Sequence, residues 1–232
     1  MQTFGGRIEQ STLKDKVLAV LRKNLITGDL VEGQLYSASA IAADLGVSTS
    51  PVREALLSLV DQGVMEAVRN RGYRVLPLGE RDRQEIHQMR TLIEIPSMVR
   101  LAGNAELLAR QDEFRMTADH IVAGATDGDV VVYLESDLEF HLGLLRILGN
   151  ERLVAAVKSL RDQTRQLKLA ALIGTDELVR TAESHIHLLE ALVADDRARV
   201  HQLMVEHLEH IRTDWHAATA ATAASGADKA AS

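Results

Sequence analysis

The sequence predicts a mainly α-helical protein made of two modules, and three observations support this prediction. β-prone residues are confined to two short runs near residue 70 of the 232-residue chain. Apolar residues recur at helical spacing through most of the remainder. Residues 1–77 carry a formal charge of +1 (nine Lys+Arg against eight Asp+Glu), and residues 78–232 carry −8 (17 against 25). This asymmetry indicates that the two modules have different partners.

The N-terminal module, residues 10–77, is expected to hold three helices followed by a β-hairpin. The predicted elements are helices over 10–27, 39–45 and 51–62 and strands over 64–68 and 73–76. Gly28 and Gly46 end the first two helices. Pro51 opens the third, because a proline in the first turn loses no helical hydrogen bond. Residues 1–9 are expected to be flexible.

These elements together describe a winged helix-turn-helix. The helix that begins at Pro51 would lie in the major groove with its N-terminal turn toward bases and phosphates. The candidate DNA-binding residues lie around that turn and at the hairpin tip: Ser48, Thr49, Ser50, Arg53, Arg69, Asn70, Arg71 and Gly72. The alternative is a three-helix module in which the arginines belong to an ordinary solvated loop.

The segment Leu45–Leu56, LGVSTSPVREAL, closely resembles the recognition region of GntR-type bacterial regulators. The resemblance implies that Arg53 and the wing around Gly72 contact DNA. Three positions depart from the pattern, because the family usually has arginine at Thr49 and often at Ser39 and Leu57. These departures leave the choice of operator open.

The C-terminal module, residues 78–217, is predicted to be an antiparallel bundle of six helices joined by short loops. The predicted helices cover 81–102, 105–124, 129–148, 151–173, 176–194 and 196–217. Residues 218–232 are rich in Ala, Thr, Ser and Gly and lack large apolar side chains. We therefore expect them to form a disordered tail.

One helix of this bundle carries Asp137 and His141 four residues apart, so both lie on one face beside leucines. His185 and His207 lie on two later helices and also have apolar neighbours one turn away. One oxygen and three nitrogen ligands are typical of a divalent transition-metal site, with zinc, nickel and manganese all plausible. The alternative is that these residues face solvent, or that three of the nine histidines point inward by chance.

The same residues resemble the metal-binding motifs of the FadR-type C-terminal domain, called FCD. The matching stretches are Asp137–His141 followed by Gly149-Asn150, His185–Ala191, and Asp196 followed by His207. The count of six helices favours the shorter, VanR-like branch.

The resemblance implies a small organic acid as effector beside the metal. Arg90 matches the first-helix arginine of the family and is the candidate for binding the effector carboxylate. Arg161 and Arg165 are weaker candidates, and an ordinary Arg90–Glu94 helix ion pair is the alternative for Arg90.

Composition excludes several classes of function. Cysteine is absent, so disulfides, thiolate metal sites and a cysteine nucleophile are excluded. Aromatic residues make up 3%, too few for a platform that stacks single-stranded nucleic acid. No apolar run is long enough for a membrane span, and the N-terminus lacks a signal peptide's apolar core, so a cytoplasmic protein is expected.

The predicted function is a ligand-responsive transcription regulator, most often a repressor in this family, that binds a double-stranded DNA operator as a homodimer. One alternative is a metal-dependent hydrolase with a His₃Asp centre. That enzyme would need a general base near the metal, and the sequence supplies no clear one. A second alternative is a regulator that senses the metal itself, without an organic effector.

Overall fold

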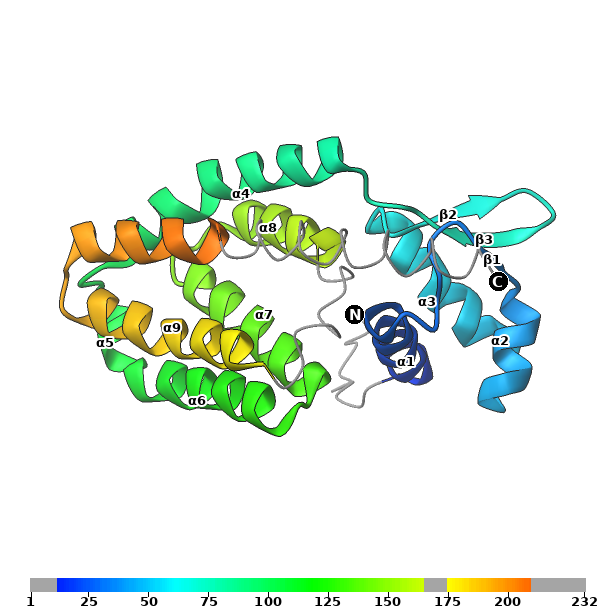
Figure 1. The fold of residues 1–232 in the computed structure, drawn as a ribbon, viewed down its shortest axis with the longest axis horizontal. Helices are drawn as coiled ribbons and strands as arrows, with labels where there is room; N and C mark the ends of the chain where they lie inside the picture. The colour runs from blue at the N-terminus through cyan, green and yellow to red at the C-terminus, as the bar shows by residue number, and fades with distance from the viewer. Residues whose placement is uncertain (1–11, 165–174, 210–232) are drawn as a thin grey trace, which may run out of the picture. The chain divides into compact units, whose positions relative to one another are not determined.

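The computed structural model describes residues 12–164 and 175–209, and the chain divides after Pro77 into two compact units (Figure 1). The described residues are predominantly helical, which confirms the predicted fold class. The predicted flexible residues 1–9 and the predicted disordered tail 218–232 lie outside the described residues. So do the ends of the predicted helices 151–173 and 196–217.

The N-terminal unit contains three helices and three strands. Its elements are α1 (Leu13–Thr27), β1 (Leu35–Tyr36), α2 (Ala38–Leu45), α3 (Thr49–Asp61), β2 (Met65–Val68) and β3 (Gly72–Val75). α3 begins at Thr49, two residues before the predicted start. Ser48 is extended and forms the N-cap, so Pro51 falls inside the first turn, where its missing N–H leaves no hydrogen bond unmade.

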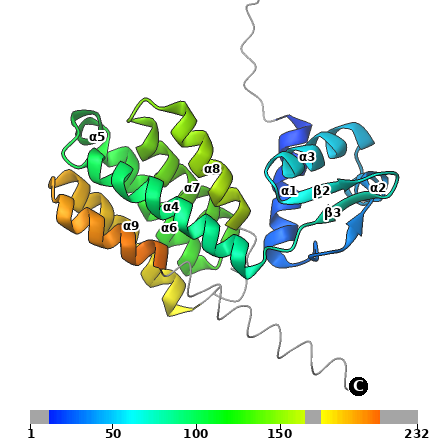
Figure 2. The same cartoon turned by 90° about the horizontal axis from the view of Figure 1, so that it is seen from above.

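The sheet of this unit has the strand order β1-β3-β2, and all pairs are antiparallel. β2 and β3 form the predicted hairpin, in which Val68 pairs with Gly72 (Figure 2). β1 was not predicted, because two residues are too few to show a period of two. Its residues Leu35 and Tyr36 pair with Arg74 and Tyr73 in the middle of β3, so β1 adds a third strand beside the hairpin.

Gly72 brings the hairpin close to β1. Its φ is +118°, and an added Cβ would lie 2.3 Å from the carbonyl oxygen of Tyr36. We expect Gly72→Ala to lower the melting temperature of the protein, because a backbone outlier costs roughly 1–3 kcal/mol and the clash adds to it. Gly28→Ala is the matched control, since Gly28 also has a positive φ of +83° but nothing lies within 4 Å of an added Cβ. An equal fall in melting temperature in the two variants would show that the close approach to Tyr36 does not contribute to the loss of stability.

The C-terminal unit contains α4 (Glu80–Leu101), α5 (Ala105–Ala109), α6 (Gln111–Asp127), α7 (Val130–Arg146), α8 (Glu151–Thr164), α9 (Asp176–Val193) and a helical segment over 197–209. The predicted helix 105–124 is divided at Arg110, whose φ of −115° and ψ of 15° are not helical. The predicted six helices therefore become seven helical segments among the described residues. The apolar pattern gives no sign of this break, because Leu107 before it and Phe114 after it are both buried.

α7 lies between two neighbours in the centre of this unit, α6 and α8. α6 packs against α7 and α9, and α8 packs against α4 and α7 (Figure 1). Gly124 allows the close approach of α6 to α7, since an added Cβ would lie 2.5 Å from the backbone nitrogen of Tyr133. Most of the C-terminal half of α7 is buried, and Phe140, Leu144 and Leu145 are completely so. In the described part of the chain, no helix has the length and apolar character needed to cross a membrane.

Candidate metal centre

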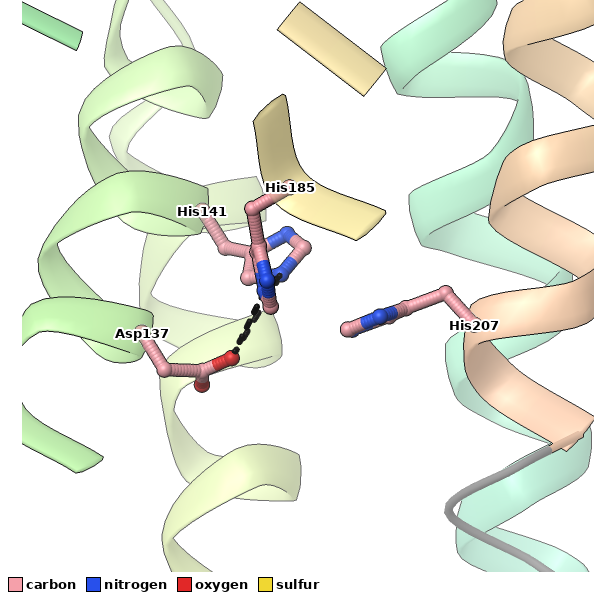
Figure 3. Close-up of side chains that lie close together, drawn as sticks. All are labelled: Asp137, His141, His185 and His207. Atoms are coloured by element: carbon pink, nitrogen blue, oxygen red, sulfur yellow. Dashed lines mark hydrogen bonds and ion pairs between the residues drawn. The ribbon is translucent and has the colours of Figure 1, made fainter. Parts of the chain in front are cut away.

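Three helical segments bring the four predicted ligands together. Asp137 and His141 lie one turn apart on α7, His185 lies on α9, and His207 lies on the segment 197–209. Figure 3 shows their side chains converging from these segments on one region. One ligand atom from each residue lies within 4.8 Å of all the others. The structure therefore groups the residues that the sequence singled out.

The spacing of these atoms fits a single divalent ion. The Nε2 atoms of His141 and His185 are 3.2 Å apart, and His185 Nε2 is 3.1 Å from Asp137 Oδ1. An ion holds nitrogen and oxygen ligands roughly 2.0–2.2 Å away, which places ligands of one ion up to about 4 Å apart. A slight contraction of the cluster would bring the four ligand atoms within about 4 Å of one another.

Nitrogens of His185 and His207 are placed as metal ligands would be. His185 Nδ1 lies 3.0 Å from the carbonyl oxygen of Ala182, to which it can donate, so that Nε2 keeps its lone pair for an ion. His207 Nε2 is buried and has no hydrogen-bond partner among the described residues. A buried polar atom without a partner is costly, and a bond to a metal would satisfy it.

Charge and burial favour the metal-binding forms of Asp137, His141 and His207. Burial lowers the pKa of His141 well below its usual value, and the nearby Arg161 lowers it further. Burial likewise lowers the pKa of His207 well below its usual value, with His185 adding to the shift. Burial alone would raise the pKa of Asp137, but Arg161 and His185 outweigh it and hold that pKa well below the ordinary value. Neutral imidazoles and an ionised carboxylate are the forms that bind divalent ions.

Phe140 packs against two of the candidate ligands, His141 and His185. Its ring meets His141 edge-to-face at 5.4 Å and His185 at 5.3 Å between centroids. Phe140 is completely buried. Packing of this kind restricts the rotamers of both imidazoles and excludes water from their apolar side, so the two rings are held in position.

Arg90, the predicted effector-binding residue, is buried beside the ligands. Its Nε donates to Glu94 Oε1 at 2.6 Å, so the helix ion pair that was the alternative does form. Its Nη2 is also buried and has no hydrogen-bond partner among the described residues. Arg90 therefore forms the ion pair and still offers an unused donor.

Arg161 is more closely connected to the ligands than the sequence suggested. Its Nη1 donates to Asp137 Oδ2 at 3.1 Å, and its other donors reach Glu94. The sequence offered no pattern for this contact, because Asp137 and Arg161 are 24 residues apart on different helices. Arg165, the other weak candidate, lies outside the described residues.

The predicted DNA-binding residues occupy two places in the N-terminal unit. Ser48, Thr49, Ser50 and Arg53 lie at the start of α3, and all are exposed except the half-buried Thr49. The tip of the hairpin carries three consecutive exposed polar residues, Arg69, Asn70 and Arg71, followed by the half-buried Gly72. Asn70 has a φ of +59°, a left-handed conformation that asparagine tolerates in turns.

The three positions that depart from the family pattern also lie near this surface. Ser39 is exposed on α2 and Thr49 is half-buried, while Leu57 is 46% exposed on α3. An exposed leucine replaces a cation here, so this unit has fewer positive charges available for phosphate contacts than the usual pattern would give.

Comparison with known proteins gives matches over both units. Residues 85–210 match the FCD domain, and residues 13–75 match the bacterial regulatory proteins of the gntR family. The chain is 28% identical over 209 residues to a probable D-xylose utilization operon transcriptional repressor of Paenarthrobacter nicotinovorans, covering 90% of this chain and 91% of that protein. It is 24% identical over 203 residues to the gluconate operon transcriptional repressor of Bacillus subtilis, covering 85% and 82%.

Solved structures share the fold. E. coli McbR/YncC aligns with a TM-score of 0.73 at 23% identity, covering 89% of this chain and 98% of that chain. A GntR transcriptional regulator from Rhodococcus sp. RHA1 aligns with a TM-score of 0.64 at 21% identity, covering 88% and 97%. The likeness extends over both units of the present chain.

Proposed function

The chain belongs to the GntR family of bacterial transcription regulators with an FCD domain, and from this premise we propose that it is a cytoplasmic, metal-loaded repressor controlled by a small carboxylate. Its family consists of transcription regulators, not enzymes, so the hydrolase alternative is abandoned. The observation that carries the proposal is the buried set of Asp137, His141, His185 and His207.

The proposed cofactor is one divalent transition-metal ion per chain, with zinc, nickel or manganese acceptable to a set of nitrogen and oxygen ligands. Four protein ligands leave positions open on nickel or manganese, which take up to six ligands, and on zinc when it expands to five. A carboxylate could occupy them, and the unused Nη2 of Arg90 would add a charge-assisted hydrogen bond. When bound, the ion supplies positive charge that attracts and orients the effector anion.

The proposed partner of the N-terminal unit is a double-stranded DNA operator. Arg53 and the hairpin residues Arg69 and Arg71 are exposed, and the start of α3 carries backbone N–H groups and small hydroxyl side chains suited to phosphate. We place α3 in the major groove and the hairpin tip beside it. Effector binding then shifts the operator affinity through a coupling free energy between the two sites.

A homodimer would place two N-terminal units on a two-fold operator, and the outer face of α4 supports this assembly. Met89 is 46% exposed and Leu92 is 64% exposed, and the exposed Pro96 continues the apolar strip. Exposed Glu85 and Arg100 lie at its two ends. A second copy packed antiparallel about Leu92 would bring each glutamate to the other copy's arginine.

We expect Leu92→Glu to convert the dimer to a monomer, because it places two like charges at the centre of an apolar contact. Operator affinity should fall with it, since each half-site would then bind separately. Sedimentation velocity of the full chain measures the assembly. Met116→Glu is the control, because Met116 is 59% exposed on α6 and should leave the dimer intact. A dimeric Leu92→Glu protein would exclude this face.

The proposed function as a whole is tested with the purified full chain. Native mass spectrometry should show one metal ion per chain. DNA from upstream of its own gene should be bound more tightly than unrelated DNA of equal length. Titration of candidate carboxylates at fixed metal concentration should weaken that binding. A response to metal with no response to any carboxylate would favour the metal-sensing alternative, and the absence of both metal and specific DNA binding would overturn the proposal.

A further inference from the structure

Glu94 is a fully buried carboxylate on α4 that lies between two arginines. Its Oε1 accepts from Arg90 Nε at 2.6 Å. Its Oε2 accepts from Arg161 Nε at 3.1 Å and from Arg161 Nη2 at 2.5 Å. Burial alone would raise the pKa of Glu94, but Arg161 and Arg90 outweigh it and hold that pKa below the ordinary value. Glu94 is therefore charged in the folded protein.

The interactions of Glu94 continue to the metal ligands. Arg161 donates to Glu94 through Nε and Nη2, and its Nη1 donates to Asp137 Oδ2 at 3.1 Å. Four buried or nearly buried charges thus form one chain in the order Arg90, Glu94, Arg161 and Asp137. Their formal sum is zero, and it would be +1 without Glu94.

This balance matters because a divalent ion adds two positive charges to a buried region. Without Glu94, the guanidinium groups of Arg90 and Arg161 would oppose the ion with little solvent to screen them. Arg161 would also interact with Asp137 alone, and so compete with the ion for that carboxylate. With Glu94 in place, Arg161 is neutralised and held in position.

We propose that Glu94 is a charge-balancing and positioning residue of the metal centre, which permits metal binding without being a ligand. The inference rests on the proposed metal site. It also explains the orientation of Arg90, whose Nε is fixed by Glu94 while Nη2 keeps no partner among the described residues. Glu94 thereby connects the metal ligands to the donor that we assign to the effector.

The test is the affinity of the full-length protein for Ni²⁺ alone, measured by competition with a chelator. Glu94→Gln should raise the Kd roughly 10–100-fold, the effect typical of losing a residue that supports a metal ligand. Glu94→Asp keeps the charge and should restore most of the affinity. Asp162→Asn is the matched control, because Asp162 is also a buried carboxylate, but it pairs with Lys158 on α8. It should leave the Kd within about threefold of the wild type.

Saturation with Co²⁺ separates a supporting role from a ligand role. The visible spectrum of the fully loaded Glu94→Gln protein should keep the wild-type band positions, because the four ligands are unchanged. A wild-type Kd in Glu94→Gln would overturn the proposal, as would a changed spectrum, which would make Glu94 a ligand. Absence of Ni²⁺ binding by the wild type and by Asp162→Asn would instead disprove the metal site itself. Circular dichroism of each variant establishes that it is folded before its Kd is compared.

Discussion

Replacing His207 by alanine is expected to abolish stoichiometric metal binding. His207 is the one candidate ligand from the segment 197–209, and its Nε2 has no hydrogen-bond partner among the described residues. Loss of a ligand should weaken binding by roughly 100-fold or more, because losing a residue that only supports a ligand already costs about 10–100-fold. Native mass spectrometry and elemental analysis of the purified variant give the metal content per chain.

The same variant has a thermodynamic consequence. An ion that binds only the folded chain stabilises it by about 2.7 kcal/mol when present at 100 times its Kd. Added metal should therefore raise the melting temperature of the wild type but not that of His207→Ala. His201→Ala is the control, because His201 is exposed on the same helical segment and should keep both metal and thermal shift. Full metal occupancy in His207→Ala would contradict the assignment of the site.

Replacing Arg53 by alanine is expected to weaken specific operator binding by roughly 1–3 kcal/mol if the arginine reads a base edge. Arg53 is exposed near the start of α3, where the recognition helix would enter the major groove. Fluorescence anisotropy with the operator and with unrelated DNA, each at several salt concentrations, measures the effect. A base contact changes the preference between the two DNAs.

A phosphate contact would behave differently, because its loss weakens binding to all sequences alike and reduces the salt dependence. Lys16→Ala on α1 serves as the control for removal of one exposed positive charge from the same unit. If Arg53→Ala binds the operator as tightly as the wild type does, the placement of α3 as the recognition helix is wrong.

Much of the fold follows from local patterns in the sequence. The period of apolar residues predicts the long helices. Gly46 marks the end of α2 and Pro51 the first turn of α3, because these signals act within a few residues. The spacing of Asp137 and His141 also predicts that they share one helix face. Apolar neighbours one turn away then added His185 and His207, and the resemblance to the FCD motifs supported the same set. The structure brings all four together.

The tertiary structure decided what connects distant parts of the chain. The break at Arg110 was invisible because the buried pattern continues across it. β1 is defined by its pairing with β3, which lies far away in the sequence. The sequence showed Glu94 as a helix partner of Arg90, four residues away. Its second partner, Arg161, is 67 residues away on α8, and it links Glu94 to Asp137. No local period encodes such a contact, because it exists only once helix packing has buried the charges and made their pairing necessary.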